Sequence, residues 1–162
     1  MVNPRTVRAR WQTENFLQDI RAASQVAVYT DGSMYSDTTP PHLGFAAKFF
    51  LQMSDGRQKS FALSGWTADG PHSSSHAELM TLLLTAILVP DDLEVTVHCD
   101  SETAIARMAQ IQENSPRREF EKSPMAYLTC WAVKWLSTRT VPLKLEWVKG
   151  HSGIQGNEDV DK

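Results

Sequence analysis

Residues 26–33 read VAVYTDGS, a short apolar and β-branched run that leads into Asp31, Gly32 and Ser33. Val, Tyr and Thr favour the pleated strand, so residues 26–30 are predicted to form a buried strand that ends at Asp31. Asp-Gly is also a common turn pair, and taken alone Asp31 is explained by a turn. The role of Asp31 therefore depends on what the rest of the chain places beside it.

Two further strands are predicted directly after the first. Apolar residues alternate along residues 45–51, and Phe61 and Leu63 point inward from the next strand. The pair Asp55-Gly56 lies between them as a hairpin signal. A loop is predicted over residues 65–72, which contain a Gly-Pro breaker. The sheet therefore opens with an antiparallel meander.

The second half of the chain alternates helices with strands. Residues 76–88 are apolar on nearly every side, which predicts a helix buried against the sheet. Residues 93–100 alternate apolar and polar and predict a fourth strand that ends at Asp100. Three elements follow: a helix capped by Ser101, a helix that starts at Ser123-Pro124, and a fifth strand over residues 143–147. This order predicts an α/β fold with a mixed sheet.

The length of 162 residues and the 41% hydrophobic content fit one globular domain. We expect the main folded domain over residues 25–162. Residues 1–24 would be an amino-terminal helical lead-in or linker, because residues 11–23 have an amphipathic helical pattern.

The composition narrows the class of protein. A net charge of −3 counts against a strongly basic face for binding duplexes. Two cysteines, Cys99 and Cys130, do not suggest a disulfide framework, which favours an intracellular, reducing compartment. Neither a signal-peptide apolar region nor a run of about 18 apolar residues is present, so no membrane partner is expected.

Three other carboxylates also have ordinary structural explanations. Glu78 follows Ser75 by three positions, the spacing of a capping box. Asp100 and Asp161 could each favour the amino end of a helix through the macrodipole. Each explanation is sufficient for its own residue.

The four carboxylates stand in four short motifs whose order is informative. These are YTDGS at residues 29–33, HAEL at 76–79, HCDS at 98–101, and WVKGHSG at 147–153, which runs into GNEDVD at 156–161. Together they resemble type 1 ribonuclease H. The last motif is the most specific, and the third alone is weak.

The resemblance implies a fold and an activity. The fold is the RNase H-like five-stranded mixed sheet, of strand order 3-2-1-4-5, flanked by helices. The activity is endonucleolytic hydrolysis of the RNA strand of RNA/DNA hybrids by a two-metal-ion mechanism, leaving 5′-phosphate and 3′-hydroxyl ends. Relatives continue beyond the last Asp into a closing helix, so this domain is expected to lack it.

The resemblance also implies roles for five residues. Asp31, Glu78, Asp100 and Asp161 would be catalytic and would bind metal, because carboxylate oxygens favour hard cations such as Mg²⁺ or Mn²⁺. Asp31 would bridge two ions, Glu78 and Asp100 would hold the one near the leaving oxygen, and Asp161 the one that activates water. His151 would be a catalytic residue that assists proton transfer or product departure.

Substrate contacts are implied at Gly32, Ser33, Ser74 and Ser75, because RNA is recognised through its 2′-hydroxyls and shallow minor groove. Many relatives carry Asn or Gln where this chain has Ser74 and Ser75. This departure is expected to alter the grip on the substrate.

The expected partner is an RNA/DNA hybrid. The motifs are also similar to those of domains joined to retroelement reverse transcriptases, which implies an attached reverse transcriptase or another nucleic-acid-binding domain. Two alternatives stay open: a non-catalytic nucleic-acid-binding or scaffolding module with an RNase H-like fold, and a relative in the same superfamily that nicks or joins DNA.

Overall fold

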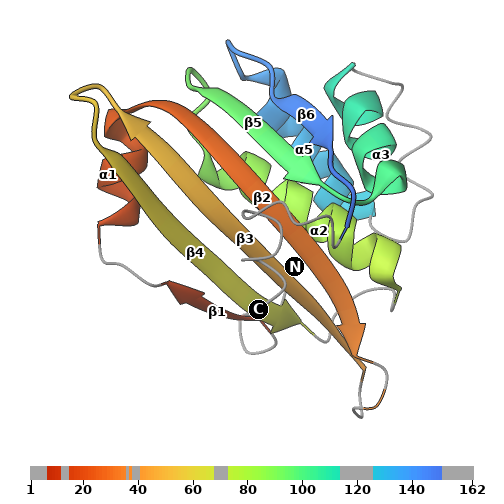
Figure 1. Ribbon diagram of the computed structural model, residues 1–162. Coiled ribbons are helices and arrows are strands. Elements are labelled where there is room, and N and C mark those ends of the chain that lie inside the picture. The colour runs from red at the N-terminus through yellow and green to blue at the C-terminus, as the bar shows by residue number, and fades with distance from the viewer. Residues whose placement is uncertain are drawn as a thin grey trace.

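The computed structural model describes residues 7–11, 15–35, 37, 41–67, 73–113 and 126–150. These residues form one six-stranded sheet of strand order β1-β4-β3-β2-β5-β6 with helices packed against it (Figure 1). The strands are β1 Val7–Trp11, β2 Ala23–Tyr35, β3 His42–Met53, β4 Gln58–Thr67, β5 Glu94–Cys99 and β6 Lys144–Trp147. The helices are α1 Phe16–Ala22, α2 Ser74–Leu88, α3 Glu102–Gln112 and α5 Ala126–Ser137.

The predicted fold class is confirmed. Strands β2 to β6 alone have the spatial order β4-β3-β2-β5-β6, which is the expected 3-2-1-4-5. The pairs β2–β3 and β3–β4 are antiparallel, whereas β2–β5 and β5–β6 are parallel. Strand β2 therefore joins the two parts of the sheet. On one side lies the antiparallel meander with β3 and β4, and on the other lie β5 and β6, which are reached by crossover connections.

The amino-terminal segment differs from the prediction of one helix over residues 11–23. The helix α1 begins only at Phe16, and Val7–Trp11 forms strand β1, which pairs antiparallel with β4. A sheet edge offers unpaired backbone groups to any passing segment. The spacing of apolar residues within a segment does not indicate pairing with a strand as distant in sequence as β4. For this reason the sequence did not predict β1. The proposed division at residues 24 and 25 stays a prediction.

Two strands are longer than their sequence patterns indicate. Strand β2 continues to Tyr35, so Asp31 lies inside a strand opposite Ala46, and its explanation as a turn residue is wrong. Strand β4 continues to Thr67 through Gly65, where a loop was expected. The reason is pairing on both sides, because β1 and β3 flank β4 there and take up its backbone hydrogen bonds. The remainder of that predicted loop, residues 68–72, lies outside the described residues.

The predicted hairpin turn is present between β3 and β4. Gly56 has a φ of +87°, a left-handed conformation that glycine adopts without steric cost. The amide of Gly56 donates to the Met53 carbonyl at 3.0 Å, and the amide of Met53 donates to the Arg57 carbonyl at 2.8 Å. The Asp-Gly signal therefore identified this turn correctly.

The core lies between the sheet and helices α2, α3 and α5, which all cover the same sheet face (Figure 1). Helix α2 is the most deeply buried, as its all-round apolar sequence predicted. Buried strand residues alternate with less buried ones, so one side of each strand faces the core. The predicted helix start at Ser123-Pro124 lies outside the described residues. Within the described part of the chain, no helix is long and apolar enough to cross a membrane.

Candidate active site

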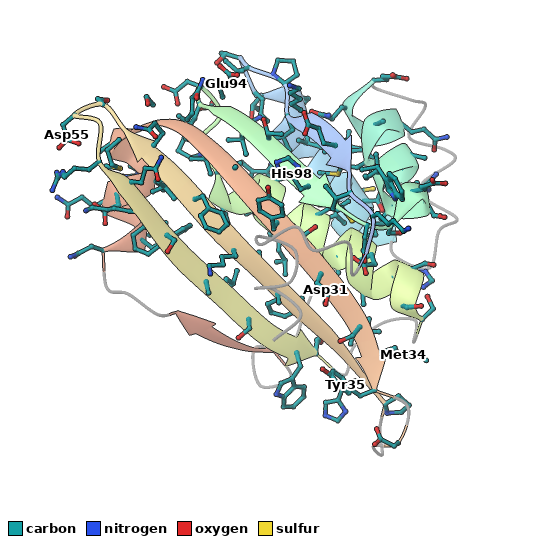
Figure 2. The ribbon with its side chains drawn as sticks, viewed as in Figure 1. Asp31, Met34, Tyr35, Asp55, Glu94 and His98 are labelled. Carbon is teal, nitrogen blue, oxygen red and sulfur yellow. The ribbon has the colours of Figure 1, made fainter. Side chains whose placement is uncertain are left out.

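The first two carboxylates are aligned by strand register. Thr30 of β2 lies opposite Cys99 of the parallel strand β5, and each is followed by an aspartate, Asp31 and Asp100. Thr30 is fully buried, so by alternation Asp31, the next residue on β2, turns toward the opposite face, while Asp100 directly follows the last residue of β5. Figure 2 shows Asp31 and His98 on the sheet face that is turned away from the helices. Because paired strands lie about 4.8 Å apart, Asp31 and Asp100 are neighbours.

Helix α2 supplies the third carboxylate. Its amino-terminal cap is Ser73, whose hydroxyl accepts a hydrogen bond from the His76 amide at 3.2 Å and also contacts His76 Nδ1. The capping box predicted between Ser75 and Glu78 is therefore wrong, because both residues lie inside the helix. Glu78 stands in the second turn with only 8% of its surface exposed. Helix capping does not explain this buried carboxylate.

Gly32 allows helix α2 to come this close to β2. A Cβ at this position would lie 2.6 Å from the Ala77 carbonyl oxygen and closer still to the Ala77 carbonyl carbon and the Glu78 nitrogen. These obstacles are backbone atoms, so only glycine fits. One turn further along α2, the Thr81 hydroxyl donates to the Asp31 carbonyl at 3.2 Å. The helix is thus held directly against the strand that carries Asp31.

The electrostatics reflect this crowding of negative groups. The pKa of Glu78 is raised to about 8, chiefly by burial and then by the charges of Asp100 and Asp31, in that order. Hydrogen bonds from the Gly32 amide and the Cys99 thiol oppose the rise. Without a cation, the site favours a protonated Glu78 at neutral pH.

The end of strand β6 and the residues after it lie against Asp100. The indole nitrogen of Trp147 donates to the Asp100 carbonyl at 3.0 Å, and the Val148 amide donates to the Cys99 carbonyl at 3.0 Å. A Cβ on Gly150 would lie 2.7 Å from Asp100 Oδ2. This glycine therefore leaves the space that the Asp100 carboxylate occupies.

The donor atoms of Glu78, Cys99 and Asp100 all lie within 4.8 Å of one another. Two of the three are carboxylates, and Asp31 adds a third carboxylate close enough to shift the Glu78 pKa. Burial raises the pKa of the Cys99 thiol to about 12, so the sulfur keeps its proton and is a poor ligand for a hard ion. The carboxylate set fits a divalent cation such as Mg²⁺ or Mn²⁺.

The remaining predicted site residues fall into two groups. Ser33 is half-buried in β2, and Ser74 and Ser75 are exposed in the first turn of α2. His151 and Asp161 lie outside the described residues. Sequence reasoning missed Cys99 as a neighbour of the site, although its inward position in the alternating fourth strand was visible.

Comparisons with known proteins show which family the chain belongs to. The family model RNase H matches residues 23–162. The chain belongs to the RNase H family. Ribonuclease H of Escherichia coli is 27% identical over 141 residues, which is 85% of each chain. Those of Shigella boydii and Escherichia fergusonii give the same values.

A solved RNase H also has a similar fold. The crystal structure of LC9-RNase H1, a type 1 RNase H with the type 2 active-site motif, superposes with a TM-score of 0.63 at 16% identity. The match covers 86% of this chain and 69% of that one. The predicted membership of the ribonuclease H family is confirmed, and the relation to retroelements stays a prediction.

Proposed function

We propose that this RNase H-family domain is an endonuclease that hydrolyses the RNA strand of RNA/DNA hybrids with divalent metal ions at Asp31, Glu78 and Asp100. The observation that carries the proposal is the convergence of these carboxylates from β2, α2 and the end of β5, with Glu78 buried and its pKa raised. A purely structural site would gain nothing from this repulsion, because like charges at close range destabilise the fold. Family membership supports ribonuclease activity on such hybrids.

Each described carboxylate has a distinct setting. Asp31 and Asp100 are half-exposed and can reach both solvent and substrate, whereas Glu78 approaches from the buried side. When bound, Mg²⁺ or Mn²⁺ would supply charge stabilisation at the phosphate and a water of lowered pKa. The sequence motifs add Asp161 as a fourth carboxylate and His151 as the proton-transfer or release residue, with 5′-phosphate and 3′-hydroxyl ends as products.

The first turn of α2 is a suitable place for substrate contacts. Ser74 precedes Glu78 by four residues and Ser75 precedes it by three, so both lie on the same side of the helix as Glu78. Their exposed hydroxyls could donate to and accept from ribose 2′-hydroxyls. Ser33, two residues beyond Asp31, lies on the same face of β2 and is assigned a similar contact.

The test is cleavage of a labelled RNA/DNA hybrid with and without Mg²⁺, beside single-stranded RNA, double-stranded RNA and duplex DNA. We expect hybrid-only, Mg²⁺-dependent cutting by the wild type and its loss in Asp31→Asn, which keeps the shape but removes a charge. The matched control is Asp92→Asn, an exposed aspartate outside the site that should cut normally. A folded wild type that binds hybrid without cutting it would favour a binding module, and cutting of duplex DNA would favour the DNA-nicking alternative.

A further inference from the structure

Cys99 is a buried polar group beside the proposed site that the cleavage reaction itself does not use. It is the last residue of β5 and is 0% exposed. Its thiol donates a hydrogen bond to Glu78 Oε2 at 3.7 Å, and its sulfur accepts one from the Ser101 amide at 3.4 Å. The sulfur therefore lies between the Glu78 side chain and the chain segment that carries Asp100.

The position of this thiol is fixed by several contacts. Cys99 pairs with Thr30 of β2 on one side and with Trp147 of β6 on the other. Its carbonyl accepts the Val148 amide at 3.0 Å. The paired backbone therefore fixes the point from which the thiol reaches Glu78.

A hydrogen-bond donor near Asp100 helps to hold the Glu78 carboxylate in place. The Glu78 side chain has three rotatable bonds, and once it is ionised, as metal binding requires, repulsion by two other negative groups favours rotamers that carry its carboxylate away from Asp100. The Gly32 amide and the Cys99 thiol are the two donors that oppose this among the described residues. The amide lies toward Asp31, whereas the thiol lies toward Asp100.

We propose that Cys99 is a positioning residue: its thiol holds the Glu78 carboxylate beside that of Asp100, and this raises the affinity of the pair for a divalent cation. The inference rests on the proposed function of the site. Cys99 is not itself a ligand, because a protonated, buried thiol is a poor partner for Mg²⁺.

Three substitutions separate the donor from the packing. Cys99→Ala removes both the donor and some volume, Cys99→Val fills the space with a slightly larger apolar side chain that has no donor, and Cys99→Ser keeps a donor in a slightly smaller side chain. The matched control is Cys130→Ala, which removes the exposed thiol on α5. Loss of one hydrogen bond typically changes an equilibrium constant, here the dissociation constant of the metal ion, by roughly 2- to 10-fold.

The first readout is the Mn²⁺ or Mg²⁺ concentration that gives half of the metal-induced rise in Tm. It requires no catalysis. We expect this concentration to rise roughly 2- to 10-fold in Cys99→Ala and Cys99→Val, and to return toward the wild-type value in Cys99→Ser. The second readout is steady-state cleavage, in which the KM for hybrid should stay unchanged while the Mg²⁺ requirement rises in parallel.

Equal half-saturating metal concentrations in all variants, whatever their Tm without metal, would show that the thiol only fills space and would overturn the proposal. So would a Cys99→Ser variant as impaired as Cys99→Val. A wild type without any metal-induced rise in Tm would overturn the metal site and with it the role of Cys99. A wild type that shows the rise but does not cut hybrid would overturn only the proposed function, since the comparison of Tm values still tests Cys99.

Discussion

At the residue scale, two glycines beside the site differ in what a methyl group would meet. At Gly150 the obstacle is Asp100 Oδ2, the end of a side chain that can rotate. We therefore expect Gly150→Ala to keep its fold, with stability changed by less than about 1 kcal/mol. Displacement of the Asp100 carboxylate by about 1 Å should lower kcat by roughly 10- to 100-fold. Thermal unfolding and single-turnover cleavage measure the two effects, and an unchanged kcat would contradict this role.

At Gly32 the obstacle is the backbone of helix α2, which cannot rotate away. Gly32→Ala must push α2 from the sheet, and overpacking of this kind should cost on the order of 3 kcal/mol. Urea denaturation of the two alanine variants side by side provides the check. The expected order is a large loss for Gly32→Ala and a small one for Gly150→Ala, and the reverse order would mean that the helix contact is misjudged.

At the element scale, one arginine connects the turn after α5 to the segment between α2 and β5. The guanidinium of Arg139 donates to the carbonyls of Pro90 at 2.8 Å and Leu93 at 2.9 Å, and also to Val141 at 2.9 Å. These acceptors lie near the start of β5, whereas the carboxylates lie at its other end. Arg139 thus supports the scaffold far from the site.

Arg139→Ala should lower the free energy of unfolding by about 2 to 3 kcal/mol, because several half-buried carbonyls lose their donor together. Arg139→Lys should recover only part of this, since an ammonium lacks the planar fork. Lys134→Ala on the exposed side of α5 serves as the control. Chemical denaturation gives the energies, and kcat measured well below the Tm should stay near wild type in all three.

Local patterns predicted elements well where burial and spacing decide the structure. The alternating fourth strand, the apolar helix α2 and the Asp-Gly hairpin follow from sequence because each is specified within a few residues. Strand β1 and the long end of β2 depend instead on partners far along the chain. The Ser75–Glu78 spacing indicated the wrong cap, because three adjacent serines lie at the start of the helix and the sequence does not show which of them caps it. In the structure Ser73 makes the cap.

At the scale of the whole molecule, the motifs single out the carboxylates, whereas the meeting of Asp31, Glu78 and Asp100 is a result of topology. Asp31 and Asp100 are neighbours because β2 and β5 pair in parallel at Thr30 and Cys99. The contacts of Trp147 and Gly150 with Asp100 join segments that no local pattern relates. The roles of His151 and Asp161 stay predictions from the motif.

The charge cluster should make metal-free stability depend on pH. The pKa of Glu78 is about 8 in the folded protein against an ordinary value of 4.5, so the folded state binds this proton more tightly than the unfolded state. The stabilisation is complete below about pH 4.5 and is lost as the pH rises toward 8. We expect the Tm in EDTA to fall over this range for the wild type and to fall less for Glu78→Gln. If the Tm of the wild type and that of Glu78→Gln fell equally with pH, the raised pKa of Glu78 would be contradicted. The control is Glu102→Gln, which changes an exposed glutamate.

The parallel register of β2 and β5 also has a consequence for the time course of folding. The meander β2–β4 joins neighbouring segments and can form early, whereas β5 must first be brought back across the sheet by α2. Until that crossover is complete, neither Glu78 nor Asp100 lies beside Asp31. A chain emerging from the ribosome would thus acquire its cluster of carboxylates only when its fold is nearly finished.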